Sequence, residues 1–137
     1  DHVEQHIGIS KDYNVFELQR ALGNKDIERA NRIVQYFEAN PKNAPLAMVV
    51  PVLHAYFARV LVYQTLQDRS EGAAAKAMRC SPYAVRDYAR AATAFSPAKV
   101  ERIFGYLRDA DKKAKGRSNA TTTDGMLLRE TVFKILH

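Results

Sequence analysis

The sequence has one cysteine and no tryptophan among its 137 residues, and it holds only six glycines and five prolines. A single thiol, Cys80, excludes an internal disulfide and a four-thiolate zinc site, so we expect an intracellular, cytoplasmic protein. The low glycine and proline content excludes collagen-like and low-complexity chains. A chain of this length and composition is expected to fold as one globular domain.

The motifs of common enzyme classes are missing as well. The sequence contains no Gly-x-Ser-x-Gly motif, no Walker phosphate loop and no dinucleotide glycine fingerprint. Asp109 and Asp111 lie two positions apart, so on a helix their side chains point about 200° apart and cannot share a proton or an ion. We expect them to pair with Arg108, Lys112 or Lys113. We therefore predict no catalytic site and no cofactor.

Three isolated groups could suggest chemistry, but each has a simpler interpretation. His2 and His6 would share one face of a helix, yet a tight metal site needs three or four ligands, so we favour a polar tail and predict no metal. His54 is expected to be a half-buried imidazole bonded to a carbonyl. Arg79 could lower the pKa of Cys80, but no histidine is near it in sequence, and we interpret it as a structural thiol.

Signals for β-strands are nearly absent, whereas helix starts recur. Asn14 with Glu17 fits a capping box, Ser70 and two Ser-Pro pairs begin further helices, and Gly23 is expected to end the first helix in a left-handed conformation. Apolar residues follow helical spacing between these points. We predict an all-α fold, a compact bundle of about seven helices over residues 15–22, 27–39, 45–66, 71–78, 82–94, 97–115 and 126–136.

One long apolar run, over residues 44–63, could suggest a membrane span. Pro45, Pro51, His54 and Arg59 interrupt it, and an arginine at the centre of a bilayer costs about 2.5 to 3.5 kcal/mol. We interpret the run as a buried core helix and predict no membrane partner. Pro51 should either kink this helix or mark its true start.

Positive charge is concentrated in the second half of the chain. Lysine and arginine number 21 against 15 acidic residues, and residues 1–69 hold eight of each sign, so the whole excess lies beyond residue 69. Residues 73–90 are similar to a helix-turn-helix whose second helix would display Tyr83, Arg86 and Arg90 to DNA. Against this, Asp87 would face phosphates, and any packed helix pair needs the same apolar spacing.

The second basic feature is the end of the predicted helix 97–115 and the segment after it. Four cations stand within six positions and could contact DNA phosphates without reading sequence: Lys112, Lys113, Lys115 and Arg117. The alternative, which we favour, is a solvated connection whose lysines complement the carboxyl end of their own helix.

Four segments, in this order and spacing, resemble the C-terminal part of the delta subunit of bacterial DNA polymerase III. They cover nearly the whole chain, so the resemblance is more specific than any single motif. The segments are IGISKDYNVFEL at residues 7–18, the alanine-rich helix pair with SPYAV at 81–85, LRDADKKAKG at 107–116 and LRETVFKIL at 128–136.

The resemblance implies a place for the chain in a larger subunit. Residues 13–137 would be the all-helical collar domain, and residues 1–12 the end of the preceding lid domain or its linker. Because the chain begins with Asp1 rather than Met, we expect it to be a piece of a longer protein. In this family two N-terminal domains of ATPase-like fold bind the sliding clamp, so clamp binding would depend on that missing region.

The resemblance also implies partners and a function. Five clamp-loader collars pack into a ring, and the delta subunit opens the clamp without hydrolysing ATP, as a non-catalytic accessory of a DNA-directed DNA polymerase. The partners would be the other clamp-loader subunits, with primed-template DNA as a further candidate. Each collar needs contact surfaces on two flanks, because head-to-tail contacts are heterologous. The sequence leaves open which tyrosines are exposed there: Tyr36, Tyr56, Tyr63, Tyr88 or Tyr106.

A second hypothesis remains beside this one. The helix-turn-helix similarity at residues 73–90 would make the chain a DNA-binding module of a transcription regulator. Salt-dependent duplex binding with a sequence preference distinguishes the two hypotheses.

Overall fold

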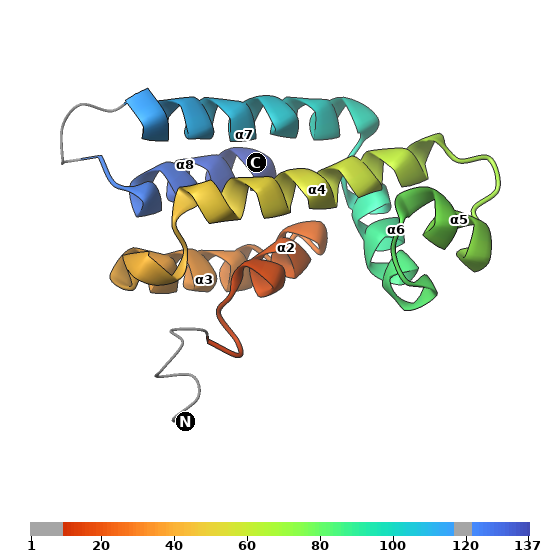
Figure 1. Cartoon of the computed structure of the whole chain (residues 1–137), viewed down its shortest axis with the longest axis horizontal. Coiled ribbons are helices and arrows are strands. Elements are labelled where there is room, and N and C mark those ends of the chain that lie inside the picture. The colour runs from red at the N-terminus through yellow and green to blue at the C-terminus, as the bar shows by residue number, and fades with distance from the viewer. Residues whose placement is uncertain (1–9, 117–121) are drawn as a thin grey trace.

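The computed structural model describes residues 10–116 and 122–137, and these residues form helices and no strands. The prediction of an all-α fold is confirmed. Figure 1 shows the helices in chain order: α2 (Val15–Gly23), α3 (Ile27–Ala39), the 3₁₀ turn η1 (Pro41–Asn43), α4 (Leu46–Thr65), α5 (Glu71–Met78), the 3₁₀ turn η2 (Pro82–Ala84), α6 (Val85–Ala94), α7 (Pro97–Gly116) and α8 (Asp124–Leu136).

Most helices begin where a capping side chain predicts. The Asn14 side chain accepts bonds from the backbone N–H groups of Phe16 and Glu17, both at 3.0 Å. Asp26 caps α3 in the same way, accepting from the Arg29 N–H at 3.1 Å. Such caps satisfy N–H groups that have no partner inside the helix. The Ser70 side chain, in contrast, makes no capping bond to α5, and α4 begins after Pro45 without a side-chain cap.

Two of the predicted helix starts differ from the structure by more than one residue. Helix α8 begins at Asp124, two positions before the predicted start, because the Thr123 hydroxyl accepts a bond from the Met126 N–H at 3.2 Å. The segment predicted as one helix over residues 82–94 begins with the 3₁₀ turn η2, which the Ser81 hydroxyl caps at the Ala84 N–H. Local hydroxyl caps therefore set both starts.

Helix α4 is the central element of the bundle. It packs against α7, α6, α2, α5 and α8, and Figure 1 shows it running between α7 and α3. In the described part of the chain it is the one helix long and apolar enough to cross a membrane. Its side chains Leu53 and Phe57 are fully buried against the other helices, as a core helix requires. The helix continues through Pro51, so the proline does not mark its start.

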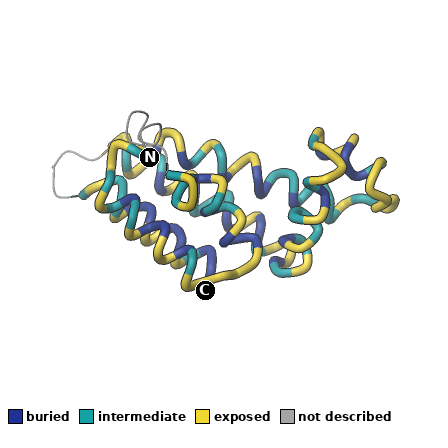
Figure 2. Tube along the Cα trace, turned by 90° about the horizontal axis from the view of Figure 1, so that it is seen from below, coloured by how far each residue is buried: buried dark blue, intermediate teal, exposed yellow. Residues whose placement is uncertain are grey.

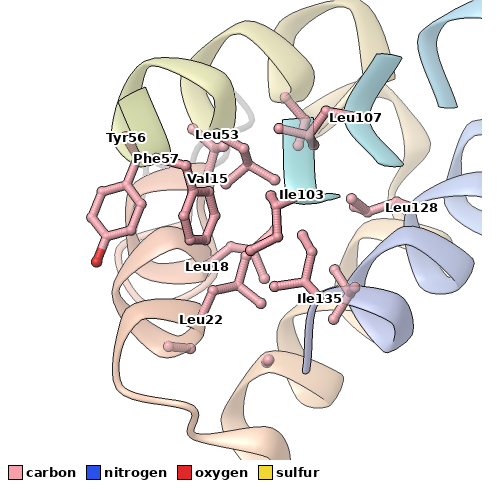
Figure 3. Packing of buried hydrophobic residues seen from close by; sticks show 14 of the residues in the cluster. Val15, Leu18, Leu22, Leu53, Tyr56, Phe57, Ile103, Leu107, Leu128 and Ile135 are labelled. Atoms are coloured by element: carbon pink, nitrogen blue, oxygen red, sulfur yellow. The ribbon is translucent and has the colours of Figure 1, made fainter. Parts of the chain in front are cut away.

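The main bundle consists of α2, α3, α4, α7, α8 and the second half of α6, around one apolar core (Figure 3). Leu18 and Leu22 from α2 meet Phe57 from α4 and Ile103 from α7 in this core. Phe57 makes edge-to-face contacts with Tyr56 at 5.1 Å and with Phe95 at 5.6 Å between ring centroids. The contact with Phe95 joins α4 to the C-terminal end of α6.

A smaller cluster lies at one end of the molecule. The end lobe consists of α5, η2 and the first turn of α6, and its buried side chains are Ala74, Ala75, Met78 and Val85. They pack on the last turns of α4 at Val62, Tyr63 and Leu66. Figure 2 shows how few buried positions this end has compared with the bundle.

Gly23 has a different role from the one that its sequence position suggests. It does not adopt a left-handed conformation; Lys25, two residues later, has the positive φ of 51°. A Cβ atom at position 23 would lie 1.9 Å from the Tyr56 hydroxyl. Glycine is therefore required because α2 approaches the buried Tyr56 ring closely, and burial raises the pKa of that phenol far above its ordinary value.

Candidate functional site

His54 lies on α4, and Cys80 lies in the turn after α5. His54 is exposed rather than half-buried, and its ring lies 4.9 Å from that of Phe104. Burial raises the pKa of the Cys80 thiol, and the cation that partly lowers it is Arg59 rather than Arg79. A thiol with a raised pKa is a poor nucleophile, which supports the structural interpretation.

Asp109 is exposed on α7, and Asp111 is partly buried. Asp111 pairs with Lys115 at 2.9 Å, one turn further along α7, and not with any of the three predicted cations. Within residues 10–116 and 122–137, no three His, Cys, Asp or Glu side chains are grouped so that they could hold a metal ion. The His2 and His6 pair lies outside the described residues.

The basic end of α7 is partly neutralised by the protein itself. Lys113 donates to Glu130 of α8 at 3.1 Å, and Lys115 is paired with Asp111. Lys112 is exposed, and Arg117 lies outside the described residues. Lys113 and Lys115 therefore already have carboxylate partners within the protein.

The helix pair that is similar to a helix-turn-helix is α5 with η2 and α6. Arg79 ends α5 in the left-handed conformation, with φ of 56°, which gives the tight turn. Val85 faces α5, whereas Tyr88 packs on Tyr56 at 5.2 Å between centroids. Tyr83, Arg86 and Arg90 are exposed, as the pattern predicts. Asp87 lies 3.8 Å from Arg90 and so adds a carboxylate to the same surface.

The sequence leaves open which of five tyrosines are exposed, and none of the five is among the most exposed large apolar side chains. Tyr56 is buried and the other four are partly buried. The most exposed are Tyr83 (93%), Phe133 (63%), Phe16 (62%) and Met126 (52%). The sequence signal for their exposure is their spacing, because each lies three or four positions from an arginine, on a helix face away from the apolar core stripe. These sets are Phe16 with Arg20 on α2, Tyr83 with Arg86 and Arg90 on η2 and α6, and Met126 with Arg129 and Phe133 on α8.

Two of these aromatics border a polar depression between α2, α5 and α6. We name it the Arg–Tyr cleft: Arg20, Glu71, Tyr83, Arg86, Asp87 and Arg90 line a cavity of about 370 Å³. A smaller depression of about 100 Å³ adjoins it, shares Arg20 and Asp87, and extends to Phe16. Tyrosine and arginine beside an exposed phenylalanine are typical of protein-protein contact sites.

A second depression lies between α3 and α8, away from the Arg–Tyr cleft. We name it the α3–α8 groove, a cavity of about 620 Å³ lined by Asn31, Val34, Gln35, Glu38, Met126, Arg129, Glu130 and Phe133. Arg129 makes a two-bond ion pair with Glu38, with Nε to Oε2 at 3.0 Å. Gly125 lets α8 approach α3 closely there, since a Cβ atom would lie 2.7 Å from the Cγ of Glu38.

Comparisons with known proteins agree on one family. The family model described as DNA polymerase III delta subunit, C-terminal domain, matches residues 12–128. No curated protein matches the chain. Among solved structures, the Bacillus subtilis DNA clamp loader delta protein (YqeN) has a TM-score of 0.69 at 18% identity, over 90% of this chain and 35% of that one. At this identity the likeness shows a shared fold, and the chain spans about a third of that protein's length.

Proposed function

Because this chain belongs to the family of C-terminal domains of the DNA polymerase III delta subunit, we propose that it is the collar domain of a clamp loader. In this role it holds its subunit beside the neighbouring collars of a five-membered ring during DNA replication. The ring opens the sliding clamp and loads it on primed DNA. Residues 13–137 form the collar, and residues 1–12 join it to the lid domain of the complete subunit.

The observation that carries this proposal is the presence of two separate exposed surfaces. The Arg–Tyr cleft belongs to α2, α5, η2 and α6, and the α3–α8 groove belongs to two other helices. A subunit in a closed ring needs a different contact surface on each flank, because head-to-tail contacts are heterologous. Both surfaces carry exposed aromatic and arginine side chains, which are enriched in interfaces.

The same proposal assigns an accessory rather than a catalytic role. Among the described residues, no three His, Cys, Asp or Glu side chains are grouped so that they could hold a metal ion. The collar would act in the cytoplasm through contacts alone. The clamp itself is bound through the N-terminal domains of the complete subunit. Nucleotide hydrolysis by the purified chain, abolished by a point substitution in it, would contradict this role.

A sedimentation experiment tests the collar function. The complete subunit is mixed with the other clamp-loader subunits, with and without residues 13–137, and association is measured by analytical ultracentrifugation. We expect a stable complex only when the collar is present. Equal association without the collar would overturn the proposal.

The alternative, a DNA-binding module, has the exposed Arg86 and Arg90 in its favour. Two carboxylates, Glu71 and Asp87, line the same cleft and would face the phosphates. We therefore expect weak duplex binding without sequence preference, and little loss when both arginines become glutamine. A large loss confined to one preferred sequence would support the regulator instead.

A further inference from the structure

The charges of the Arg–Tyr cleft are only partly neutralised within the protein. Arg90 lies 3.8 Å from Asp87 and donates to the Asn24 side chain at 3.4 Å. Glu17 is bonded to Arg29 at 3.0 Å, and its other oxygen is 4.0 Å from Arg20. The stronger interaction of Glu17 is thus with Arg29, which leaves Arg20 weakly paired.

Arg86 is in a different situation from the other two arginines. No carboxylate of the described residues forms an ion pair with Arg86, although Asp87 and Glu71 line the same cleft. The three cleft arginines therefore exceed the two cleft carboxylates, and the excess charge is concentrated at Arg86 and Arg20. Guanidinium groups bind carboxylates through two parallel hydrogen bonds, so an arginine without a partner at an exposed site suits a carboxylate ligand.

Two exposed aromatic side chains border these arginines. Tyr83 is 93% exposed and Phe16 is 62% exposed, on η2 and on α2 respectively. Rings of this kind can cover an apolar side chain of a partner, and they lose little conformational entropy on binding. The cleft thus offers cations and apolar surface side by side.

We infer that the Arg–Tyr cleft binds an acidic segment of a neighbouring clamp-loader subunit, with a carboxylate between Arg86 and Arg20 and an apolar side chain on Tyr83 and Phe16. The inference rests on the proposed function, and it adds the chemistry of the partner for one of the two flanks. The two carboxylates of the cleft oppose a polyphosphate backbone, which presents a continuous row of negative charge. A protein segment can place one carboxylate at Arg86 and keep others away from Glu71.

Charge variants of the complete subunit test this inference. Association with the other purified clamp-loader subunits is measured for Arg86→Lys, Arg86→Gln and Arg86→Glu. We expect the affinity to fall in that order, by about tenfold or more for the glutamate variant. Tyr83→Ala should also weaken binding. Arg102→Glu, an exposed charge reversal on α7 outside both surfaces, is the matched control and should bind as the wild type does.

A further variant, Glu71→Gln, tests whether the partner segment is acidic or basic. Glu71→Gln removes a cleft carboxylate that has no ion-pair partner among the described residues. An acidic partner should then bind about two- to threefold more tightly. Weaker binding of this variant would indicate a basic partner and overturn the inference. Circular dichroism and unfolding midpoints should be unchanged for all these exposed positions, so loss of folding is separated from loss of binding.

The remaining outcomes distinguish the inference from the proposed function. If the wild-type subunit assembles and the Arg86 and Tyr83 variants assemble equally well, the inference is overturned and the collar function stands. If the wild type does not assemble, the collar function fails and the inference with it. If Arg86→Glu weakens primed-template DNA binding and leaves subunit association unchanged, the cleft is a nucleic-acid site and the inference is overturned.

Discussion

The main bundle and the end lobe differ in how they are held together. The bundle buries large side chains such as Leu18, Phe57 and Ile103 from several helices in one cluster. The lobe buries two alanines, one methionine and one valine, and it relies on polar bonds to α4 as well. Arg59 donates from its Nε to the carbonyl of Met78, the last residue of α5, at 2.9 Å. Regions with fewer buried apolar contacts open at a lower free energy than a core does.

This difference matters for function because the lobe carries Tyr83 and Arg86. Most of the Arg–Tyr cleft belongs to the less tightly packed end of the molecule, whereas the α3–α8 groove is formed by two helices of the main bundle. We expect the cleft to adjust its shape on binding and the groove to stay fixed. The following substitutions test the comparison.

The largest effect should come from the bundle core. Phe57→Ala removes a fully buried ring that contacts Tyr56 and Phe95, and such truncations cost about 3 to 5 kcal/mol. Urea denaturation should show this loss as one cooperative transition. The exposed apolar residue Ile27, replaced by alanine, is the control and should change stability by less than about 1 kcal/mol. If Phe57→Ala lowered the free energy of unfolding as little as Ile27→Ala does, the bundle core would not be the main source of stability.

Replacing one glycine in each region by alanine should have opposite effects on stability: Gly23 lies in the main bundle and Gly72 in the end lobe. Gly23→Ala places a Cβ atom against the Tyr56 hydroxyl, and overpacking of this kind costs about 1 to 3 kcal/mol. A Cβ atom added at Gly72 of α5 would meet no neighbouring side chain within 4 Å, so Gly72→Ala should stabilise α5 by about 0.5 to 1 kcal/mol. Thermal unfolding measures both. In a Tyr56→Phe background the cost at position 23 should fall, and an undiminished cost would contradict the close approach.

The bond between Arg59 and the Met78 carbonyl should matter mainly for the lobe. Arg59→Met keeps most of the length of the side chain but removes the donor, and we expect a loss of about 1 to 2 kcal/mol. Native-state hydrogen exchange should show faster exchange of α5 amides and little change in α7. Equal acceleration in both helices would mean that the lobe and the bundle open as one unit.

The Cys80 thiol gives a smaller, pH-dependent test of the same lobe. Burial raises the pKa of the thiol, so the folded state favours its neutral form. The contribution to stability is complete below the ordinary thiol pKa of about 8.5 and is lost as the pH rises through the higher folded value. Alkylation by iodoacetamide should therefore be slower in the folded chain than in urea. Alkylation of the folded chain as fast as in urea would contradict the assignment.

The sequence predicts where the helices begin better than it predicts which residues of different helices contact one another. Helix starts at Asn14, Asp26 and Ser96 depend on bonds within three residues, so local pattern is sufficient. The predictions for Gly23 and His54 are wrong, and the contacts that these residues do make are with Tyr56 and Phe104 on other helices. These contacts depend on which helices lie side by side in the fold. A local sequence pattern does not specify that arrangement.

The candidate surfaces are predictable only in part, for the same reason. Tyr83, Arg86 and Arg90 follow one helical stripe, and the stripe is sufficient to predict their exposure. It could not reveal that Arg20 of α2 and Glu71 of α5 line the same cleft. Phe133 lies within a family segment, but its exposure follows from the packing of its neighbours Val132 and Ile135 into the core.

The smallest effect should be at the carboxyl end of α7, where Lys113 and Lys115 have carboxylate partners. Lys113 is bonded to Glu130 and Lys115 to Asp111, so we expect Lys113→Gln with Lys115→Gln to leave primed-template DNA binding by the assembled clamp loader unchanged. Binding is measured against salt concentration, and the salt slope should also be unchanged. A slope smaller by about one to two would mean that these lysines contact phosphates. Glu130→Gln is the matched control: it frees Lys113 without removing a cation, and it should strengthen DNA binding only if Lys113 lies beside the DNA.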